Sequence, residues 1–191
     1  MKTVIWDVDD VLNDLMKMWF EEKWLPAHPE CKLTFEDLTE NPPLGVLGIT
    51  METYLKSLDE YRVTNYESLE PVSDVLAWFN LNGFMFRHVA LSSCPLFFAP
   101  ISAKWVFKHF GHWVRGFHFV PSKRPGLNVP KYEDTKVQVL ERFFEADIFI
   151  DDNPLNVREA EKRGIKTILW PRPWNNSRMK ISEALALLSH Y

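Results

Sequence analysis

Five aspartates lie in two clusters, each directly after a short apolar segment of the chain. Asp7, Asp9 and Asp10 follow Val-Ile-Trp, whereas Asp151 and Asp152 follow Ile-Phe-Ile. If the clusters meet in space, two carboxylates about 4 Å apart repel by roughly 4 kcal/mol at an effective dielectric near 20. A hard divalent cation removes that repulsion, and Mg²⁺ suits a few carboxylates combined with waters and a substrate phosphate. The two clusters therefore predict a magnesium site that takes a phosphorylated substrate.

The Asp-x-Asp pattern of the first cluster is suited to phosphoryl chemistry. Asp7 can attack phosphorus as a nucleophile and form an aspartyl phosphate. Asp9, two residues on and across a turn, can protonate the leaving oxygen and later activate water. A hydroxyl and a lysine are then needed to hold the remaining phosphoryl oxygens. Ser92 follows another apolar segment, at the position expected for that hydroxyl.

An alternation of apolar strands and amphipathic helices positions these residues. Strands are expected at residues 4–6, 84–91, 117–120, 148–150 and 165–170, and helices at residues 71–82, 101–110, 135–144, 154–163 and 181–188. Strands separated by helices indicate a doubly wound, Rossmann-like α/β fold with a parallel sheet of about five strands. Ligands of such sheets bind beyond the carboxyl ends of the strands, which is where the acids lie.

Residues 14–70 interrupt this alternation and are called the cap segment below. They contain two helix candidates, at residues 14–24 and 50–58, and a proline-rich stretch between them. The cap segment begins directly after the first acidic cluster, so we expect it to lie over the site. The expected organisation is a catalytic core of residues 1–13 and 71–191 with a helical cap of residues 14–70.

Composition narrows the class of protein. The chain has 191 residues, 46% of them hydrophobic, which is enough for a buried core in one domain with an insertion. The 22 basic residues are outnumbered by 26 acidic ones, so binding to a nucleic acid polymer is disfavoured. The sequence has no uninterrupted apolar run of about 18 residues, and the short apolar start does not resemble a signal peptide. We therefore expect a cytoplasmic protein that does not bind membranes.

Three segments resemble motifs of the haloacid-dehalogenase-like (HAD-like) hydrolase superfamily, many of whose members are Mg²⁺-dependent phosphatases. Residues 4–12 resemble the first motif, an apolar strand followed by Asp-x-Asp. Residues 89–92 resemble the second motif, a strand ending in Ser or Thr, and residues 148–152 resemble the fourth, which supplies metal-binding acids. The superfamily often has a small pair such as Gly-Thr after Asp-x-Asp, where this chain has Asp10-Val11.

The resemblance implies a role for each matching residue. Asp7 is the nucleophile and a metal ligand, and Asp9 is the acid/base with its backbone carbonyl on the metal. Ser92 binds phosphate. Asp152 is the expected direct metal ligand, with Asp151 bound directly or through water. Because the dehalogenase and phosphonate-cleaving branches lack an acid at the second Asp, its presence here favours phosphate-ester hydrolysis.

The third motif is a single lysine, and the sequence offers more than one candidate. Lys136 opens a helix that leads into the second acidic strand, which fits the layout of the superfamily. Lys123 follows the third expected strand directly and is the alternative. Lys131 and Lys104 are less favoured.

The expected function is that of a Mg²⁺-dependent phosphomonoesterase acting on a small-molecule phosphate ester. The cap segment resembles the layout of the deoxyribonucleotidase-like branch, which puts a nucleotide among the candidate substrates, although that likeness concerns the fold only. Two alternatives stay open: phosphoryl transfer to another acceptor with the same residues, and a non-catalytic interaction protein. Taken alone, the Asp-x-Asp pattern also fits a solvated turn, and residues 151–154 also fit a helix cap.

Overall fold

The computed structural model describes residues 1–126, 128–130, 132–143 and 145–191. Its centre is a five-stranded, all-parallel sheet in the order β3-β2-β1-β4-β5. The strands are β1 Thr3–Trp6, β2 Arg87–Cys94, β3 Val114–Pro121, β4 Ile148–Asp151 and β5 Lys166–Leu169. The expected doubly wound α/β fold is confirmed, and β1, which leads into the first acidic cluster, is the central strand.

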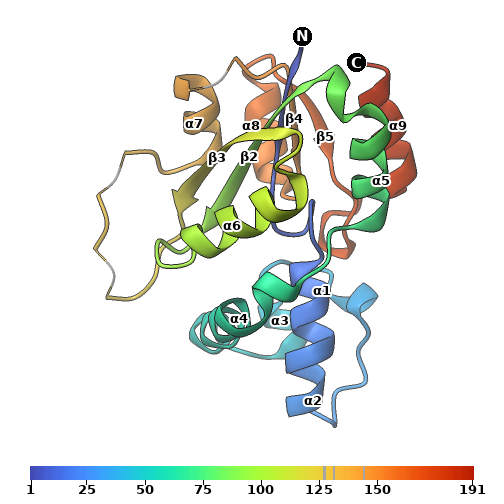
Figure 1. The fold of residues 1–191 in the computed structure, drawn as a ribbon. Helices are drawn as coiled ribbons and strands as arrows, with labels where there is room; N and C mark the ends of the chain where they lie inside the picture. The colour runs from blue at the N-terminus through green and yellow to red at the C-terminus, as the bar shows by residue number, and fades with distance from the viewer. Residues whose placement is uncertain (127, 131, 144) are drawn as a thin grey trace.

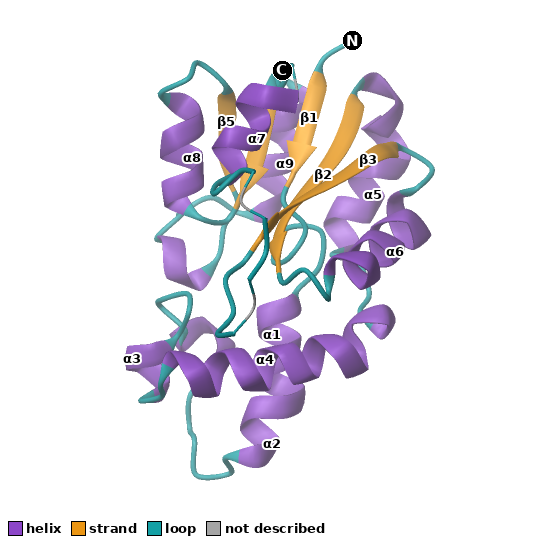
Figure 2. Cartoon of the chain, turned by 90° about the vertical axis from the view of Figure 1, so that its left-hand side faces the viewer, coloured by secondary structure: helices purple, strands orange, loops and turns teal. Residues whose placement is uncertain are grey.

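Helices cover both faces of the sheet (Figures 1 and 2). One face packs against α5 Ser73–Asn82, α6 Ala99–Phe110 and α9 Ile181–Ser189, and the other against α7 Lys136–Phe143 and α8 Pro154–Glu161. Successive side chains of a strand point to opposite faces. Accordingly, Trp6 of β1 packs toward the α5 face and Ile5 toward the α7 face, and both are fully buried.

The cap segment forms a helical layer beyond the carboxyl ends of the strands (Figure 1). Its helices are α1 Leu15–Trp19, the π-helical turn η1 Phe20–Trp24, α2 Leu25–Ala27, α3 Leu44–Leu47 and α4 Met51–Asn65; 3₁₀ turns η2 Phe35–Asp37 and η3 Tyr66–Ser68 complete it. Its ends lie side by side, because Val72 N donates to Leu12 O at 2.9 Å. The apolar side chains of α1 and α4 belong to the same hydrophobic cluster as the α5 face of the sheet. The division into core and cap at residues 13 and 71 stays a prediction.

Several expected elements differ in their bounds. The strand expected at residues 84–91 begins at Arg87, after the 3₁₀ turn η4 Gly83–Met85, and continues to Cys94, so Ser92 lies within it. The helix expected at 50–58 runs on to Asn65, because Tyr61 and Arg62 also find buried positions. The helix expected at 135–144 is observed as α7, with residue 144 outside the described residues.

The 3₁₀ turn η5 Pro173–Asn175 follows β5 and brings Trp174 beside the carboxyl end of β4. In the described part of the chain, no helix has both the length and the apolarity needed to cross a lipid bilayer.

Candidate active site

The register of the central strands brings the two acidic clusters together. Trp6 of β1 pairs with Ile150 of β4, and the next residues along the two strands are Asp7 and Asp151. The backbone N–H of Asp7 donates to Ile150 O at 2.9 Å, which continues the ladder by one bond. Two carboxylates 144 positions apart in the sequence are therefore neighbours because their strands are hydrogen-bonded neighbours.

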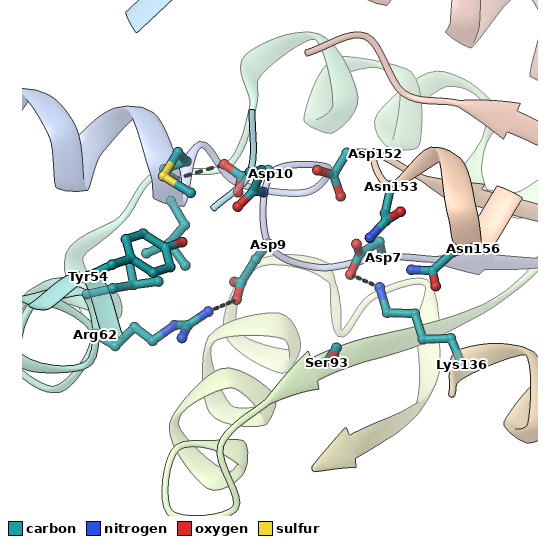
Figure 3. Close-up of a pocket in the computed structure, with 14 residues that line it drawn as sticks. Asp7, Asp9, Asp10, Tyr54, Arg62, Ser93, Lys136, Asp152, Asn153 and Asn156 are labelled. Carbon is teal, nitrogen blue, oxygen red and sulfur yellow. Dashed lines mark hydrogen bonds and ion pairs between the residues drawn. The ribbon is translucent and has the colours of Figure 1, made fainter. Parts of the chain in front are cut away.

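Lys136 connects these two carboxylates. Its Nζ lies 2.5 Å from Asp7 Oδ1 (Figure 3). The same Nζ lies 2.8 Å from Asp151 Oδ2. The lysine side chain is 4% exposed and the Asp151 side chain is completely buried. Burial disfavours the ammonium charge, but the carboxylates of Asp151 and Asp7 outweigh burial and raise the pKa of Lys136. The lysine is therefore held as a cation at the first residue of α7.

Asp151 is further fixed by the helix that follows it. Its Oδ1 accepts from Asn153 N at 2.8 Å, and both of its oxygens accept from Asn156 Nδ2 at 3.1 Å. Asn153 caps α8, since its side chain accepts from Leu155 N. The capping role foreseen for residues 151–154 thus coexists with a place in the acidic cluster, and α8 orients the carboxylate.

Asp152 approaches the cluster from the other side of the β4 end. Trp174 Nε1 donates to Asp152 Oδ2 at 2.6 Å, which holds the carboxylate in a buried position. Burial and the neighbouring charge of Asp151 raise the pKa of Asp152 to about 6. Burial likewise raises the pKa of Asp7 well above its usual value, although the Lys136 ammonium opposes this shift. The cluster therefore carries more negative charge than its surroundings compensate.

The three acids have the donor set of a hard cation. One oxygen each from Asp7, Asp151 and Asp152 can be chosen so that all three lie within 4.8 Å of one another. All three residues are buried, and carboxylate oxygens are the ligands that Mg²⁺ prefers. Burial raises the pKa of Asp7 and of Asp152 first of all, and the charges of the neighbouring acids add to it, so a bound cation would offset both effects. The residues present therefore fit the expected Mg²⁺ ion.

Asp10 shapes the turn that follows β1. It adopts φ +63°, in the left-handed region that Asp and Asn tolerate better than most residues. Its Oδ1 accepts from Met16 N at 2.9 Å, and its backbone carbonyl accepts from Arg172 Nε at 2.6 Å. The Asp10 side chain thus accepts a hydrogen bond from the first turn of α1 and links the end of β1 to the cap segment.

Asp9 points away from the other acids and toward the cap segment (Figure 3). Its Oδ2 lies 3.2 Å from Arg62 Nη2 of α4. Its Oδ1 accepts from Tyr66 OH at 2.6 Å and from Asn13 Nδ2 at 3.4 Å. The Asp9 side chain is 14% exposed, so part of the carboxylate still faces the cavity.

The cavity beside these groups has a volume of about 190 Å³. Asp7, Asp9, Asp10, Asp152 and Lys136 lie on its core side. On the cap side, Met16 of α1 and Tyr54, Leu58 and Arg62 of α4 contribute to its wall. The cap segment therefore encloses the space next to the acids with a mixture of apolar groups and one guanidinium.

The two serines of β2 differ in which side of the sheet they face. Ala90 packs on the α5 face and Leu91 on the α7 face, so Ser92 shares the side of Ala90 and Ser93 the side of Leu91. Ser93 lines the cavity, whereas the Ser92 hydroxyl is fully buried and makes no hydrogen bond with a described residue. The weakly polar Cys94 thiol does interact with Ser92. Phosphate binding by Ser92 stays a prediction, and Ser93 is the serine that the structure places at the cavity.

Comparison of the sequence with protein-family models and with curated proteins gives no match. Comparison of the structure does. A haloacid-dehalogenase-like family hydrolase from Streptococcus pneumoniae aligns over 100% of this chain and 98% of its own, with a TM-score of 0.57 and 12% identity. A HAD-superfamily hydrolase of subfamily IA from Geobacter sulfurreducens aligns over 100% and 96%, with a TM-score of 0.53 and 14% identity. The chain has the haloacid-dehalogenase-like fold. The protein tyrosine kinase A of Mycobacterium tuberculosis is also similar, over 87% and 82% of the two chains, with a TM-score of 0.60 and 15% identity.

On this haloacid-dehalogenase-like fold, the structure brings together most of the residues expected at the site. Asp7, Asp151, Asp152 and Lys136 converge at the carboxyl ends of β1 and β4. Lys123, the alternative third-motif lysine, is exposed and is not a lining residue of the cavity.

Of the two less favoured lysines, the structure describes only Lys104. Lys104 pairs with Glu67 at 2.7 Å on the surface. Lys131 lies outside the described residues.

The residues of the cap segment and of η5 that surround the acids were not predicted from the sequence. Arg62, Tyr66 and Trp174 all hold a carboxylate of the two clusters. Only long-range packing brings them there. A strict strand alternation at residues 89–93 was the one signal that could have pointed to Ser93.

Proposed function

We propose that the chain is a member of the HAD-like superfamily and hydrolyses small phosphate monoesters with Asp7 as the nucleophile. The observation that supports this most is the buried contact of Lys136 with both Asp7 and Asp151 at the carboxyl end of the central strands. A lysine held as a cation beside a carboxylate at the wall of a cavity can bind a phosphoryl group next to its attacking oxygen.

In the first step, a carboxylate oxygen of Asp7 attacks the phosphorus atom of the ester. The new bond is Asp7 O–P, and the bond that breaks joins phosphorus to the leaving oxygen. Asp9, in its protonated form, gives its proton to that oxygen, so the product leaves as a neutral alcohol. Asp9 follows Asp7 by two residues and lines the same cavity. The turn after β1 separates the two side chains.

In the second step, water attacks the phosphorus atom of the aspartyl phosphate. Asp9, now ionised, takes the proton of the water, and the Asp7 O–P bond breaks. Inorganic phosphate leaves, Asp7 is again a carboxylate, and Asp9 is again protonated. The proton that Asp9 gave up in the first step is thus regained in the second.

The phosphoryl oxygens need donors that stay in place during both steps. Lys136 supplies a fixed positive charge, and the hydroxyl of Ser93 faces the cavity from β2. Asp7, Asp151 and Asp152 would hold Mg²⁺, which when bound neutralises the acids and withdraws charge from the phosphoryl oxygens. Side chains of the cap segment line the cavity on the side opposite the acids.

The proposal is tested by phosphate release from p-nitrophenyl phosphate with Mg²⁺ or with a chelator. We expect turnover that needs Mg²⁺ and falls by at least about 10³-fold in Asp7→Asn. Asp74→Asn, which changes an exposed acid at the start of α5, is the matched control and should keep full activity. Adding acceptor alcohols separates hydrolysis from transfer. Full activity of Asp7→Asn, or no turnover of any ester in a broad panel, would contradict the proposal.

A further inference from the structure

The acid/base candidate Asp9 is held from the cap side by a guanidinium that is itself rigidly supported. Arg62 Nη2 lies 3.2 Å from Asp9 Oδ2, and Arg62 Nη1 lies 3.1 Å from Asp59 Oδ1 on the same helix. The Arg62 guanidinium also lies 5.3 Å from the centroid of the fully buried Phe98 ring. Two acids and an aromatic face therefore fix the plane of this guanidinium.

Asp59 is in turn anchored to the core. Arg124, in the loop after β3, makes contacts of 2.5 Å through Nε to Asp59 Oδ2 and 2.8 Å through Nη2 to Asp59 Oδ1. This pair needs no help from Arg62. Removing Arg62 would leave Asp59 with a bidentate partner, so a substitution at Arg62 mainly affects Asp9.

The other carboxylate oxygen of Asp9 is held independently. Tyr66 OH donates to Asp9 Oδ1 at 2.6 Å, and Asn13 Nδ2 lies 3.0 Å from Tyr66 OH. The Tyr66 ring is fully buried and packs edge-on against Phe98, with ring centroids 4.6 Å apart. Both oxygens of Asp9 therefore have a partner, which leaves the carboxylate one orientation relative to the cavity.

We propose that Arg62 is a positioning residue that holds the Asp9 carboxylate in the orientation from which its proton reaches the leaving oxygen. This rests on the proposed function. As the proton leaves, negative charge develops on Asp9, and a guanidinium 3.2 Å away stabilises that charge. Because Arg62 belongs to α4 and Asp9 to the core, general acid catalysis then depends on the cap segment being seated over the site.

The leaving group provides the test, because only a poor leaving group needs protonation. kcat/KM reports the steps up to formation of the aspartyl phosphate and is measured for p-nitrophenyl phosphate and for an alkyl phosphate with an uncharged leaving group. In Arg62→Gln we expect kcat/KM to fall by about tenfold or more for the alkyl ester and by less than about threefold for the aryl ester. Arg62→Lys, which keeps the charge but not the fork, should show the same split with a smaller loss.

Arg163→Gln is the matched control, since it removes a guanidinium that also pairs with two acids, Glu141 and Glu159, but has no contact with Asp9 or Asp59. We expect the ratio of the two kcat/KM values to stay at the wild-type level in this variant. If Arg62→Gln does not fold, Arg62→Lys carries the same test, and Tyr66→Phe tests the second partner of Asp9. In Tyr66→Phe, the alkyl ester should again lose more than the aryl ester.

Three results would overturn the proposal. An equal loss for both esters would mean that Arg62 does not act on the leaving group. A loss confined to an alkyl ester whose leaving group carries a carboxylate would make Arg62 a substrate-binding residue. If the wild-type protein turns over no ester at all, the proposed function fails and the role of Arg62 fails with it. If the wild-type protein is active and Arg62→Gln loses the same factor for both esters, only the role of Arg62 fails.

Discussion

Lys136 Nζ lies 2.5 Å from Asp7 Oδ1, and both side chains are almost completely buried. A buried cation between two carboxylates cannot be removed without leaving acids uncompensated. An exposed lysine such as Lys123 cannot take its place, because among the described residues Lys136, in the first turn of α7, is the lysine that lines the cavity. The contact therefore has consequences for both stability and activity.

We expect Lys136→Met to lower kcat/KM for p-nitrophenyl phosphate by at least about 10²-fold, because a fixed charge on the phosphoryl oxygens is lost. Without Mg²⁺, the variant should also lose about 3–5 kcal/mol of unfolding free energy in urea, because Asp151 and Asp7 are left unpaired. Lys123→Met is the control and should resemble wild type, since Lys123 is exposed. If instead Lys123→Met lost the activity and Lys136→Met kept it, Lys123 would be the third-motif lysine.

Mg²⁺ should stabilise the folded protein more at pH 7.5 than at pH 5. The folded-state pKa of Asp152, about 6, is above its usual value of 3.8, so the folded state binds this proton more tightly than the unfolded state. Its charge therefore costs roughly 3 kcal/mol of stability at pH 7, and that cost shrinks as the pH falls from 6 toward 3.8. A cation relieves the same cost, so the rise in Tm with Mg²⁺ should shrink at pH 5, where the acid is protonated. An equal rise at both pH values, or an undiminished rise in Asp152→Asn, would contradict this expectation.

His88 should make the protein less stable in acid. His88 is a buried residue of β2. Trp6 Nε1 donates to its Nδ1 at 3.0 Å, and its Nε2 donates to Gly83 O at 2.7 Å. These contacts require the neutral ring, and burial lowers the pKa of His88 to about 4 from 6.5. The unfolded state then binds the proton more tightly, and stability falls as the pH drops from 6.5 toward 4, by roughly 2 kcal/mol at pH 5.

The measurement for His88 is unfolding free energy against pH, compared with His88→Gln. Glutamine offers one acceptor and one donor and does not titrate. The unfolding free energy of His88→Gln should therefore fall less steeply between pH 6.5 and pH 4 than that of the wild-type protein. Parallel curves for the two proteins would show that the pKa of His88 is the same in the folded and the unfolded state, which would contradict this expectation.

Ser93→Ala should lower kcat/KM by about tenfold, since the hydroxyl that faces the cavity is lost. Ser92→Ala should leave activity near the wild-type level and leave stability unchanged or slightly raised, because the buried Ser92 hydroxyl lacks a hydrogen-bond partner among the described residues. A larger loss in Ser92→Ala than in Ser93→Ala would instead support the serine that the sequence motif indicates.

The residues that come directly after the strands could be predicted from the sequence. Asp7 and Asp151 each follow a run of three apolar residues, and neighbouring parallel strands bring such positions to one edge of the sheet. Which serine faces the cavity depends on the pleat of β2, and its true start at Arg87 was not visible in the apolar pattern. A shift of one residue moves a side chain to the other face of the sheet.

The partners of Asp9 could not be predicted. Arg62 lies in a helix whose expected end was residue 58, so it stood outside every predicted element. Its approach to Asp9 follows from the packing of α4 against the core, and no local pattern encodes that packing. The same holds for Trp174, which reaches Asp152 from a turn after β5.

The central claim is that Asp7 becomes phosphorylated during turnover. The most direct measurement mixes the protein with a radiolabelled phosphate ester and Mg²⁺, quenches the reaction in acid within milliseconds, and maps the labelled peptide. If Asp7 is the nucleophile, the label lies on the peptide that contains Asp7, is lost on treatment with hydroxylamine, and is absent from Asp7→Asn. Steady turnover with no trapped label, or a label on another peptide that persists in Asp7→Asn, would contradict that claim.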